Sequence, residues 1–290
     1  MSSTPGVRQG PSPITSSPAE VWSAGEAYEP YVGRWSRVVA RRFIDWLSVP
    51  AESDWLDVGC GSGALVQTIL DLARPRRVIG IDSSPGYVAF AAGRIKNAKT
   101  EFKVGDAQRL DQVESSLDAA VSGLVLNFLP RPERGAAEMA RILRPGGMAA
   151  AYVWDYAGQM QMMRTFWDAA VELNPAARAL DEGVRFAVCR PGPLRALWEG
   201  AGLEAVETLA VDVETRFRDF DDFWTPFLGG QGPAPSYAMS LGEAGRTRLR
   251  ESIRSRLKPE ADGSIRLTAR AWAVRGRKPR SQGLQSGEKR

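Results

Sequence analysis

The sequence predicts an α/β protein in which helices cover both faces of a mostly parallel β-sheet. Short apolar strands alternate with helices between residues 55 and 156. The loops between them are short, which is typical of parallel sheets with helices on both sides. The first strand runs into the stretch WLDVGCGSGAL, Trp55–Leu65, which has three glycines at alternate positions. Because such sheets bind ligands at the carboxyl ends of their strands, this loop is the leading candidate for a binding site.

The elements of this core follow one another in a regular order. Val39, Phe43, Trp46 and Leu47 recur at helical spacing, which predicts a helical cap before the sheet, ended by Pro50. The predicted strands are Trp55–Val58, Arg77–Asp82, Glu101–Asp106, Leu117–Leu126 and Met148–Tyr156. The predicted helices between them are Ala64–Leu72, Tyr87–Arg94 and Pro132–Leu143, the last ending at the sequence RPGG.

The regular alternation stops after Tyr156. Helices are predicted over Gly158–Leu173 and Glu243–Leu257, and another ends at Gly202. Further strands are predicted near Leu203–Thr215 and Ser264–Gly276. In the aromatic stretch between them, Phe220, Phe223 and Phe227 recur at helical spacing, which is more typical of a core than of a pocket wall.

Composition narrows the class of protein. The chain of 290 residues is 43% hydrophobic, which is enough to bury one large core. It has no histidine, and its two cysteines match no metal or disulfide pattern, so no metal site is expected. The formal net charge is +4, but residues 275–290 alone carry +5, which leaves −1 for the rest. A nucleic-acid partner is therefore not expected, and the basic end is interpreted as a solvated tail.

The glycine loop has two possible interpretations as a ligand site. Glycine lets the backbone approach a ligand closely and adopt positive φ at little cost. The spacing Gly59-x-Gly61-x-x-Ala64 also satisfies the dinucleotide fingerprint, and Asp82 ends the next strand, where an acid can hold ribose hydroxyls. A P-loop is excluded because no Gly-Lys-Ser/Thr follows.

The order of several blocks separates these readings. LDVGCGSG (56–63), VIGIDSSPGYVAFAAGR (78–94), VGDAQRL (104–110), LDAAVSGLVLNFLPRP (117–132) and EMARILRPGGMAAAYVW (138–154) occur in sequence. Over roughly residues 50–156 the chain resembles the class I S-adenosylmethionine-dependent methyltransferases, in particular the small-molecule type 11 branch that includes UbiE-like proteins. The resemblance implies a Rossmann-like sheet of seven mostly parallel strands between helices, and S-adenosylmethionine as the cofactor.

The resemblance also implies roles for particular residues. The loop Gly59–Gly63 would wrap the methionine part of the cofactor, with Asp57 ordering the loop backbone. Asp82 would take the ribose hydroxyls beside Ser83, and Asp106 and Ala107 would contact the adenine, because carboxylates accept hydrogen bonds from hydroxyls and amines. The full set of expected cofactor-binding residues is Asp57, Gly59, Gly61, Gly63, Asp82, Ser83, Asp106, Ala107 and Asn127.

The resemblance implies fewer roles for the residues near the methyl acceptor. Asp155 and Tyr156 end the fifth predicted strand and are candidates for a base or a substrate anchor, although a strand-end acid can simply face water. Asn127 follows the fourth strand, where relatives often place a residue beside the methyl group. Tyr31, with Tyr28 and Trp35, lies in a segment that forms a lid in related folds, although ordinary helix packing would also explain these aromatics.

Three other features have mainly structural interpretations. Arg34, Arg37 and Arg41 share one helical face and are interpreted as a solvated stripe. The methionine-rich stretch at 159–167 could wall an adaptable apolar pocket. Cys60 lies in the glycine loop, but nothing in the sequence activates it as a nucleophile, so it is interpreted as a small filler.

We therefore expect a cytoplasmic enzyme that transfers a methyl group from S-adenosylmethionine to a small organic acceptor at O, N or C. The domain organisation expected is a disordered leader at 1–20, a methyltransferase domain at 21–276 and a basic disordered tail at 277–290. Within the domain, residues 50–156 would be the cofactor-binding core and 157–260 substrate-side insertions. Two alternatives remain: an NAD(P)-dependent oxidoreductase, and a non-catalytic protein that binds S-adenosylmethionine. No membrane span is expected.

Overall fold

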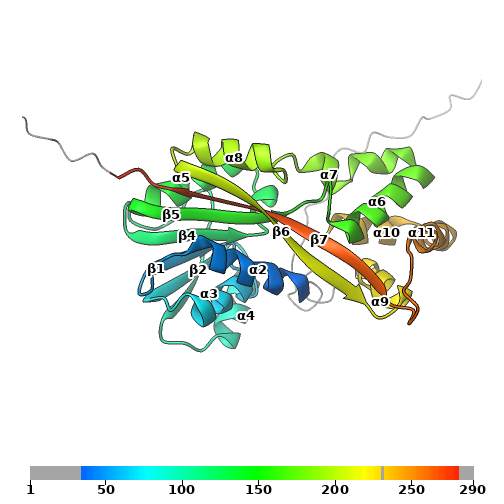
Figure 1. The fold of residues 1–290 in the computed structure, drawn as a ribbon, viewed down its shortest axis with the longest axis horizontal. Coiled ribbons are helices and arrows are strands. Elements are labelled where there is room, and N and C mark those ends of the chain that lie inside the picture. The colour runs from blue at the N-terminus through cyan, green and yellow to red at the C-terminus, as the bar shows by residue number, and fades with distance from the viewer. Residues whose placement is uncertain (1–33, 230–231, 281–290) are drawn as a thin grey trace, which may run out of the picture.

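The computed structural model describes residues 34–229 and 232–280, which build one sheet with helices on both faces (Figure 1). In space the strands lie in the order β3-β2-β1-β4-β5-β7-β6. The strands are β1 Asp54–Val58, β2 Arg77–Asp82, β3 Thr100–Val104, β4 Leu117–Gly123, β5 Leu143–Trp154, β6 Glu204–Phe217 and β7 Ile265–Arg277. The first five are parallel, whereas β7 is antiparallel to both β5 and β6. The predicted seven-stranded, mostly parallel fold is confirmed.

Each face of the sheet is covered by its own helices. On one face lie α2 (Arg34–Leu47), α3 (Ala64–Leu72) and α4 (Pro85–Arg94), and on the other α5 (Pro132–Ile142) and α8 (Pro191–Gly200). The helix α3 and the strand β2 have the bounds predicted from the sequence, because glycine or charged residues stand at or beside their ends. The strands β1, β2 and β4 are buried along most of their length, as expected for the middle of a sheet covered on both sides, whereas β3 has no buried residue.

The remaining helices form a lobe at the far end of the antiparallel pair β6–β7, which extends beyond the other strands (Figure 1). This lobe contains α6 Gln161–Leu173, α9 Phe220–Trp224, α10 Pro233–Ser240 and α11 Glu243–Arg256, with the one-turn helix α7 Glu182–Arg185 between it and the sheet. Phe166 stacks on Phe227 with ring centroids 4.6 Å apart, and Phe223 is also fully buried. The prediction that the phenylalanine stripe is core is confirmed for Phe223 and Phe227.

The fifth strand differs from its prediction. The sequence RPGG was expected to end a helix and precede the strand, but β5 already begins at Leu143 and includes these residues as a bulge opposite β4. The bulge depends on Gly146, which has φ of 82°, and on Gly147, whose added Cβ would lie 2.9 Å from the Arg144 carbonyl oxygen. Two glycines that predict a turn in isolation can therefore also build a bulge within a strand.

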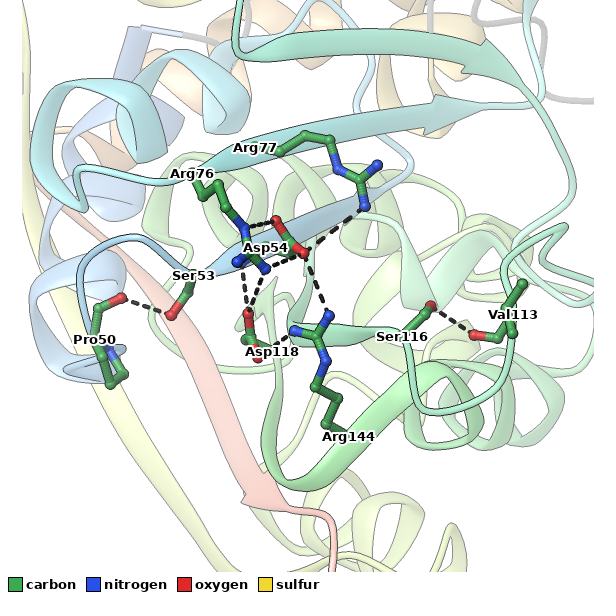
Figure 2. Close-up of polar contacts among 9 residues, drawn as sticks. All are labelled: Pro50, Ser53, Asp54, Arg76, Arg77, Val113, Ser116, Asp118 and Arg144. Atoms are coloured by element: carbon green, nitrogen blue, oxygen red, sulfur yellow. Dashed lines mark hydrogen bonds and ion pairs between the residues drawn. The ribbon is translucent and has the colours of Figure 1, made fainter.

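An ion cluster joins four strands at the end of the sheet where β1 begins (Figure 2). Asp54 on β1 accepts two hydrogen bonds from Arg76, at 2.8 and 2.6 Å, and lies 3.5 Å from Arg144 of β5. Arg144 also pairs with Asp118 of β4 at 2.6 Å, and Asp118 in turn accepts from the Asp54 backbone N–H. The hydrogen bond from Arg76 is the largest factor that lowers the pKa of Asp54.

None of the helices in the described ranges is long and apolar enough to cross a membrane.

The ion cluster generates a stability prediction. Because the folded-state pKa of Asp54 lies below its unfolded value, its contribution is present above about pH 4 and is lost as the pH falls through the folded-state pKa. Asp54→Asn should lower the free energy of unfolding by about 1–2 kcal/mol at pH 7, a figure reduced for the exposed Arg76. Urea unfolding should show this gap shrinking as the pH falls toward 3. Glu101→Gln, which removes an exposed pair with Lys103, should cost less than about 0.5 kcal/mol. A gap for Asp54→Asn that does not change with pH would contradict the assignment.

Candidate functional site

The glycine corner, residues 59–63, turns the chain from β1 into α3. Gly59, Gly61 and Gly63 all have positive φ, at 77°, 50° and 82°. A Cβ on Gly59 would lie 2.4 Å from a methyl carbon of Val125, and one on Gly63 would lie 2.6 Å from Ile95, whereas Gly61 has open space around it. Packing therefore accounts for two of the glycines, and Gly61 presents bare backbone toward the space beside the sheet.

Asp82 at the end of β2 fixes this corner. Its Oδ2 accepts the Gly61 N–H at 2.9 Å, and its Oδ1 accepts the Ser84 N–H at 2.9 Å. The corner is also tied to β2 through the Ile81 carbonyl oxygen, which accepts the N–H groups of Gly59 and Cys60 at 2.7 and 2.9 Å. Three consecutive N–H groups are thus committed to β2, which gives the corner a defined shape without a ligand.

Asp57, the acid two residues before the first glycine, is buried with 1% of its surface exposed. Neither carboxyl oxygen has a hydrogen bond of ordinary geometry within the described residues, although the nearby Val66 N–H slightly favours the charged form. Burial, followed by the charge of Asp82, raises the pKa of Asp57 to about 8. A buried carboxyl group without a hydrogen bond is costly, which suggests that its position serves a ligand.

A cavity of about 330 Å³ opens beside the corner. One side is the glycine corner and the start of α3, and a second is the end of β2 with Asp82 and Ser83. Residues 123–125 and Phe128, after β4, form a third side. The fourth side consists of residues at the end of β5 and beyond it, and it carries three of the aromatic rings: Tyr152 and Trp154 of β5, then Tyr156, together with Met163 and Glu182. Its size lies within the range of small-molecule sites.

The charged side chains among the described residues of the cavity wall are all acidic. Among the described residues that line the cavity are three carboxyl groups, from Asp57, Asp82 and Glu182, and no Lys or Arg. The Tyr87 hydroxyl has a raised pKa, because it is partly buried and then because it lies near Asp82. This described part of the wall therefore favours a ligand with positive charge.

The cavity brings together six of the predicted site residues. Its wall includes Asp57, Gly59, Gly61, Asp82, Ser83 and Tyr156. Gly63 caps α3 behind the corner and does not line the cavity. Tyr31, together with Tyr28, lies outside the described residues. Trp35 is described, and its ring packs edge-on against Phe217 at 5.1 Å, so helix packing accounts for that contact.

The predicted adenine contacts lie outside the cavity wall. The strand β3 ends at Val104, two residues before Asp106, and Asp106 Oδ1 accepts the Gln108 N–H at 2.8 Å in a turn. Neither Asp106 nor Ala107 lines the cavity. Asn127, in the 3₁₀ turn Leu126–Phe128, is buried, and its Nδ2 has no hydrogen-bond partner within the described residues. Their roles in cofactor binding stay predictions.

Asp155 stabilises the turn that follows β5. Its Oδ2 accepts the Gln159 N–H at 2.8 Å, and a Cβ on Gly158 would lie 2.5 Å from this carboxyl group. The side chain therefore holds the turn between β5 and α6, and it does not line the cavity. Tyr156, its neighbour, does line the cavity, so of this pair Tyr156 is the better placed to contact a substrate.

Sequence reasoning missed several cavity residues. Tyr87 lies one turn into α4, and Ser36 lies near the start of α2. Glu182 is the most consequential omission, since it adds a third carboxyl group. Cys60 also lines the cavity, but burial raises the pKa of its thiol, which keeps it protonated at neutral pH and is consistent with a filler.

A parallel sheet with a glycine corner after β1 and an acid after β2 defines a Rossmann-like nucleoside-binding fold. Residues 56–151 match the family model described as a methyltransferase domain. The chain is 29% identical over 129 residues to malonyl-[acyl-carrier protein] O-methyltransferase from Hahella chejuensis, covering 44% of this chain and 46% of that protein. It is 31% identical over 101 residues to demethylmenaquinone methyltransferase from Desulfitobacterium hafniense, covering 33% of this chain and 40% of that protein.

The fold is also similar to that of phosphoethanolamine N-methyltransferase 2 from Haemonchus contortus, solved with S-adenosyl-L-methionine. The TM-score is 0.55 at 16% identity, over 88% of this chain and 56% of that chain. The chain spans less than half the length of the curated relatives above. Residues 56–151 are thus identified as a class I methyltransferase domain of the type 11 branch.

The corner generates a prediction that separates its glycines. Gly59→Ala should lower the free energy of unfolding by about 2–4 kcal/mol, from left-handed strain and overlap with Val125. Gly61→Ala should cost only about 1 kcal/mol of strain, because its Cβ meets no atom. Chemical unfolding of both variants measures the difference. Equal losses would show that Val125 yields and that the two positions are equivalent.

Asp57 generates a pH prediction. Its pKa is raised to about 8 in the folded state, so between about pH 4 and pH 8 the unfolded chain has lost a proton that the folded chain keeps. Stability should therefore fall as the pH rises through this window, by up to about 1.4 kcal/mol per pH unit. Asp57→Asn removes this contribution, so the variant should gain stability relative to the parent protein between pH 5 and 8. Parallel stability curves in urea would argue against the raised pKa.

Proposed function

We propose that the protein transfers a methyl group from S-adenosylmethionine to a small organic acceptor. One observation carries the proposal: the bare corner at Gly61 faces a cavity whose described wall holds carboxyl groups and no Lys or Arg. S-adenosylmethionine has a sulfonium, an ammonium and a carboxylate, and thus a net positive charge. When bound, it supplies a methyl group that is activated by the sulfonium.

The residues present fit this cofactor. Asp57 would hold the ammonium group. The buried carboxyl group of Asp57 has no hydrogen-bond partner within the described residues, and the ammonium would supply one that is positively charged. Asp82 would take the ribose hydroxyls with the lone pairs not used by Gly61 and Ser84, beside Ser83. Asp106 and Ala107 are retained as proposed adenine contacts on the basis of the family resemblance alone.

The same geometry disfavours the oxidoreductase alternative. A dinucleotide cofactor places a pyrophosphate against the N–H groups of such a corner. Here the Gly61 N–H is already donated to Asp82, and those of Gly59 and Cys60 to Ile81. A pyrophosphate would also meet the negative charge of Asp82 at close range, which opposes its binding.

The chain's own contribution to the reaction would be mainly positioning. The aromatic side of the cavity and the corner would hold the acceptor and the methyl group in contact and in line, and orientation of this kind can supply about 7–11 kcal/mol. The walls would also exclude water from the reacting atoms. The buried free cysteines Cys60 and Cys189 agree with a reducing compartment, and we propose the cytoplasm as the location.

Binding of S-adenosylmethionine tests the proposal directly. Isothermal titration should give saturable binding to the parent protein, and Asp82→Ala should weaken it by about 1–3 kcal/mol through lost charge-assisted hydrogen bonds. Asp71→Ala, at an exposed position of α3, is the control and should leave the affinity unchanged. Binding of NAD in place of S-adenosylmethionine would refute the proposal. Transfer of a labelled methyl group to any member of a small-molecule acceptor panel would separate an enzyme from a non-catalytic binding protein.

The raised pKa of Asp57 predicts that binding releases a proton. At pH 7 this carboxyl group is largely protonated, and a bound ammonium would lower its pKa. Titrations in phosphate and in Tris, which differ in ionisation enthalpy, should report release of close to one proton per cofactor. Asp57→Asn should abolish the buffer dependence. Identical binding enthalpies in both buffers for the parent protein would contradict the role of Asp57.

A further inference from the structure

Trp154 carries a buried polar group in the cavity wall that the proposed cofactor contacts do not account for. Only 1% of its surface is exposed, and its indole Nε1 has no hydrogen-bond partner within the described residues. A buried N–H without a partner costs free energy, and such groups are rare in native proteins. Among the described residues with a buried polar atom of this kind, only Asp57 and Trp154 line the cavity.

Strand alternation explains why Trp154 lies in this wall. Tyr152, Trp154 and Tyr156 stand at alternate positions at the end of β5 and just beyond it, and all three line the cavity. Trp154 belongs to the core that the sheet forms with α2, α3 and α6, whereas Val153 belongs to the core on the side of α5 and α8. Successive side chains of a strand lie on opposite faces of the sheet, so the register of β5 directs Trp154 to the face that holds the cavity.

The pairing register separates Trp154 from the proposed position of the methionine part of the cofactor. Asp57 lies opposite Val121 on β4, and Val121 lies opposite Ala150 on β5. Trp154 is four residues beyond Ala150, and β5 is the second strand from β1, so the two positions differ by roughly 13 Å along the strands and 10 Å across them. The cofactor carboxylate is bonded to the same carbon as the ammonium proposed to lie at Asp57. It therefore stays on the β1 side, and the nucleoside extends away from Trp154, toward Asp82 of β2.

The chemistry around Trp154 favours a neutral partner. Leu124 and Met163 line the same cavity, and the described part of its wall contains no Lys or Arg. A carboxylate at the indole N–H would bring a charge that this wall has no cation to balance, and it would share the cavity with the carboxyl groups of Asp57 and Asp82. A neutral carbonyl oxygen accepts the same hydrogen bond without that cost.

We propose that the Trp154 indole N–H donates a hydrogen bond to a carbonyl oxygen of the methyl acceptor. The acceptor is then a neutral carbonyl compound with a mainly apolar body, and its carbonyl group lies at the end of β5. The inference rests on the proposed function and adds the chemical class of the acceptor. The bond would satisfy the unpaired donor and would orient the acceptor relative to the methyl group.

The test measures binding of simple probes to the complex with S-adenosylhomocysteine, so it needs no knowledge of the natural acceptor. Acetophenone presents a carbonyl oxygen on an apolar ring, and α-methylstyrene has the same shape with a methylene group in place of that oxygen. Trp154→Phe removes the N–H and keeps an aromatic ring. In ligand-observed NMR titrations this variant should bind acetophenone about tenfold more weakly, relative to α-methylstyrene, than the parent protein does. Benzoate, which is anionic, should bind the parent protein more weakly than acetophenone.

The Trp154 indole proton gives a second readout that does not depend on a variant. Its resonance can be assigned in the parent protein by through-bond NMR. It should move downfield when acetophenone binds and should move less with α-methylstyrene, because only the ketone accepts a hydrogen bond. A merely structural role for Trp154 would not produce this difference. Trp46→Phe makes the same chemical change on α2, outside the cavity wall, and should leave both probe affinities unchanged.

The outcomes distinguish the two proposals. Failure of the parent protein to bind S-adenosylhomocysteine or S-adenosylmethionine would overturn the proposed function itself. With the cofactor product bound, three results would each overturn the role of Trp154 alone: no binding of acetophenone, an unchanged ratio of the two probe affinities in Trp154→Phe, or equal shifts of the indole resonance with both probes. Tighter binding of benzoate than of acetophenone would overturn the neutral carbonyl class.

Discussion

The hydrogen bond from the Gly61 N–H to Asp82 Oδ2 is the interaction on which the site depends. It ties the turn after β1 to the end of β2, so that two neighbouring strands present one continuous surface. The positive φ angles at Gly59, Gly61 and Gly63 are needed to make that turn, and packing against Val125 and Ile95 sets its position. Because the corner has its shape without a ligand, ordering its backbone adds little to the free-energy cost of binding.

Negative charge links this corner to the proposed chemistry. Asp57 and Asp82 stand on adjacent strands, and burial of Asp57, followed by the charge of Asp82, raises the pKa of Asp57. That arrangement destabilises the free protein at neutral pH and is relieved by a cation. Glu182 extends the carboxyl wall to the β5 side, where the aromatic rings gather. Charge would thus recruit the cofactor, and the aromatic side of the cavity would hold the second substrate.

The sequence was most informative where structure and chemistry are local. Asp57, the three glycines and Asp82 lie within one strand–turn–helix–strand unit, so their proximity follows from parallel pairing of β1 and β2. Glu182 carried no such signal, because its place depends on Arg164, Asp181 and Trp167, which meet only through tertiary packing. The bulge at Gly146 and Gly147 was missed for a related reason: its partner Asp118 lies on another strand. Asp106 and Asn127 were expected at the ends of longer strands, but β3 ends at Val104 and β4 at Gly123, so both residues lie in the turns that follow, and neither lines the cavity.

The most direct test is a crystal structure of the protein with S-adenosylhomocysteine. The account requires the sugar hydroxyls at Asp82, the amino group of the homocysteine at Asp57, and the sulfur directed toward the aromatic side near Tyr156. Density for the nucleoside elsewhere, or a corner that accepts a pyrophosphate in its place, would contradict the account at its foundation.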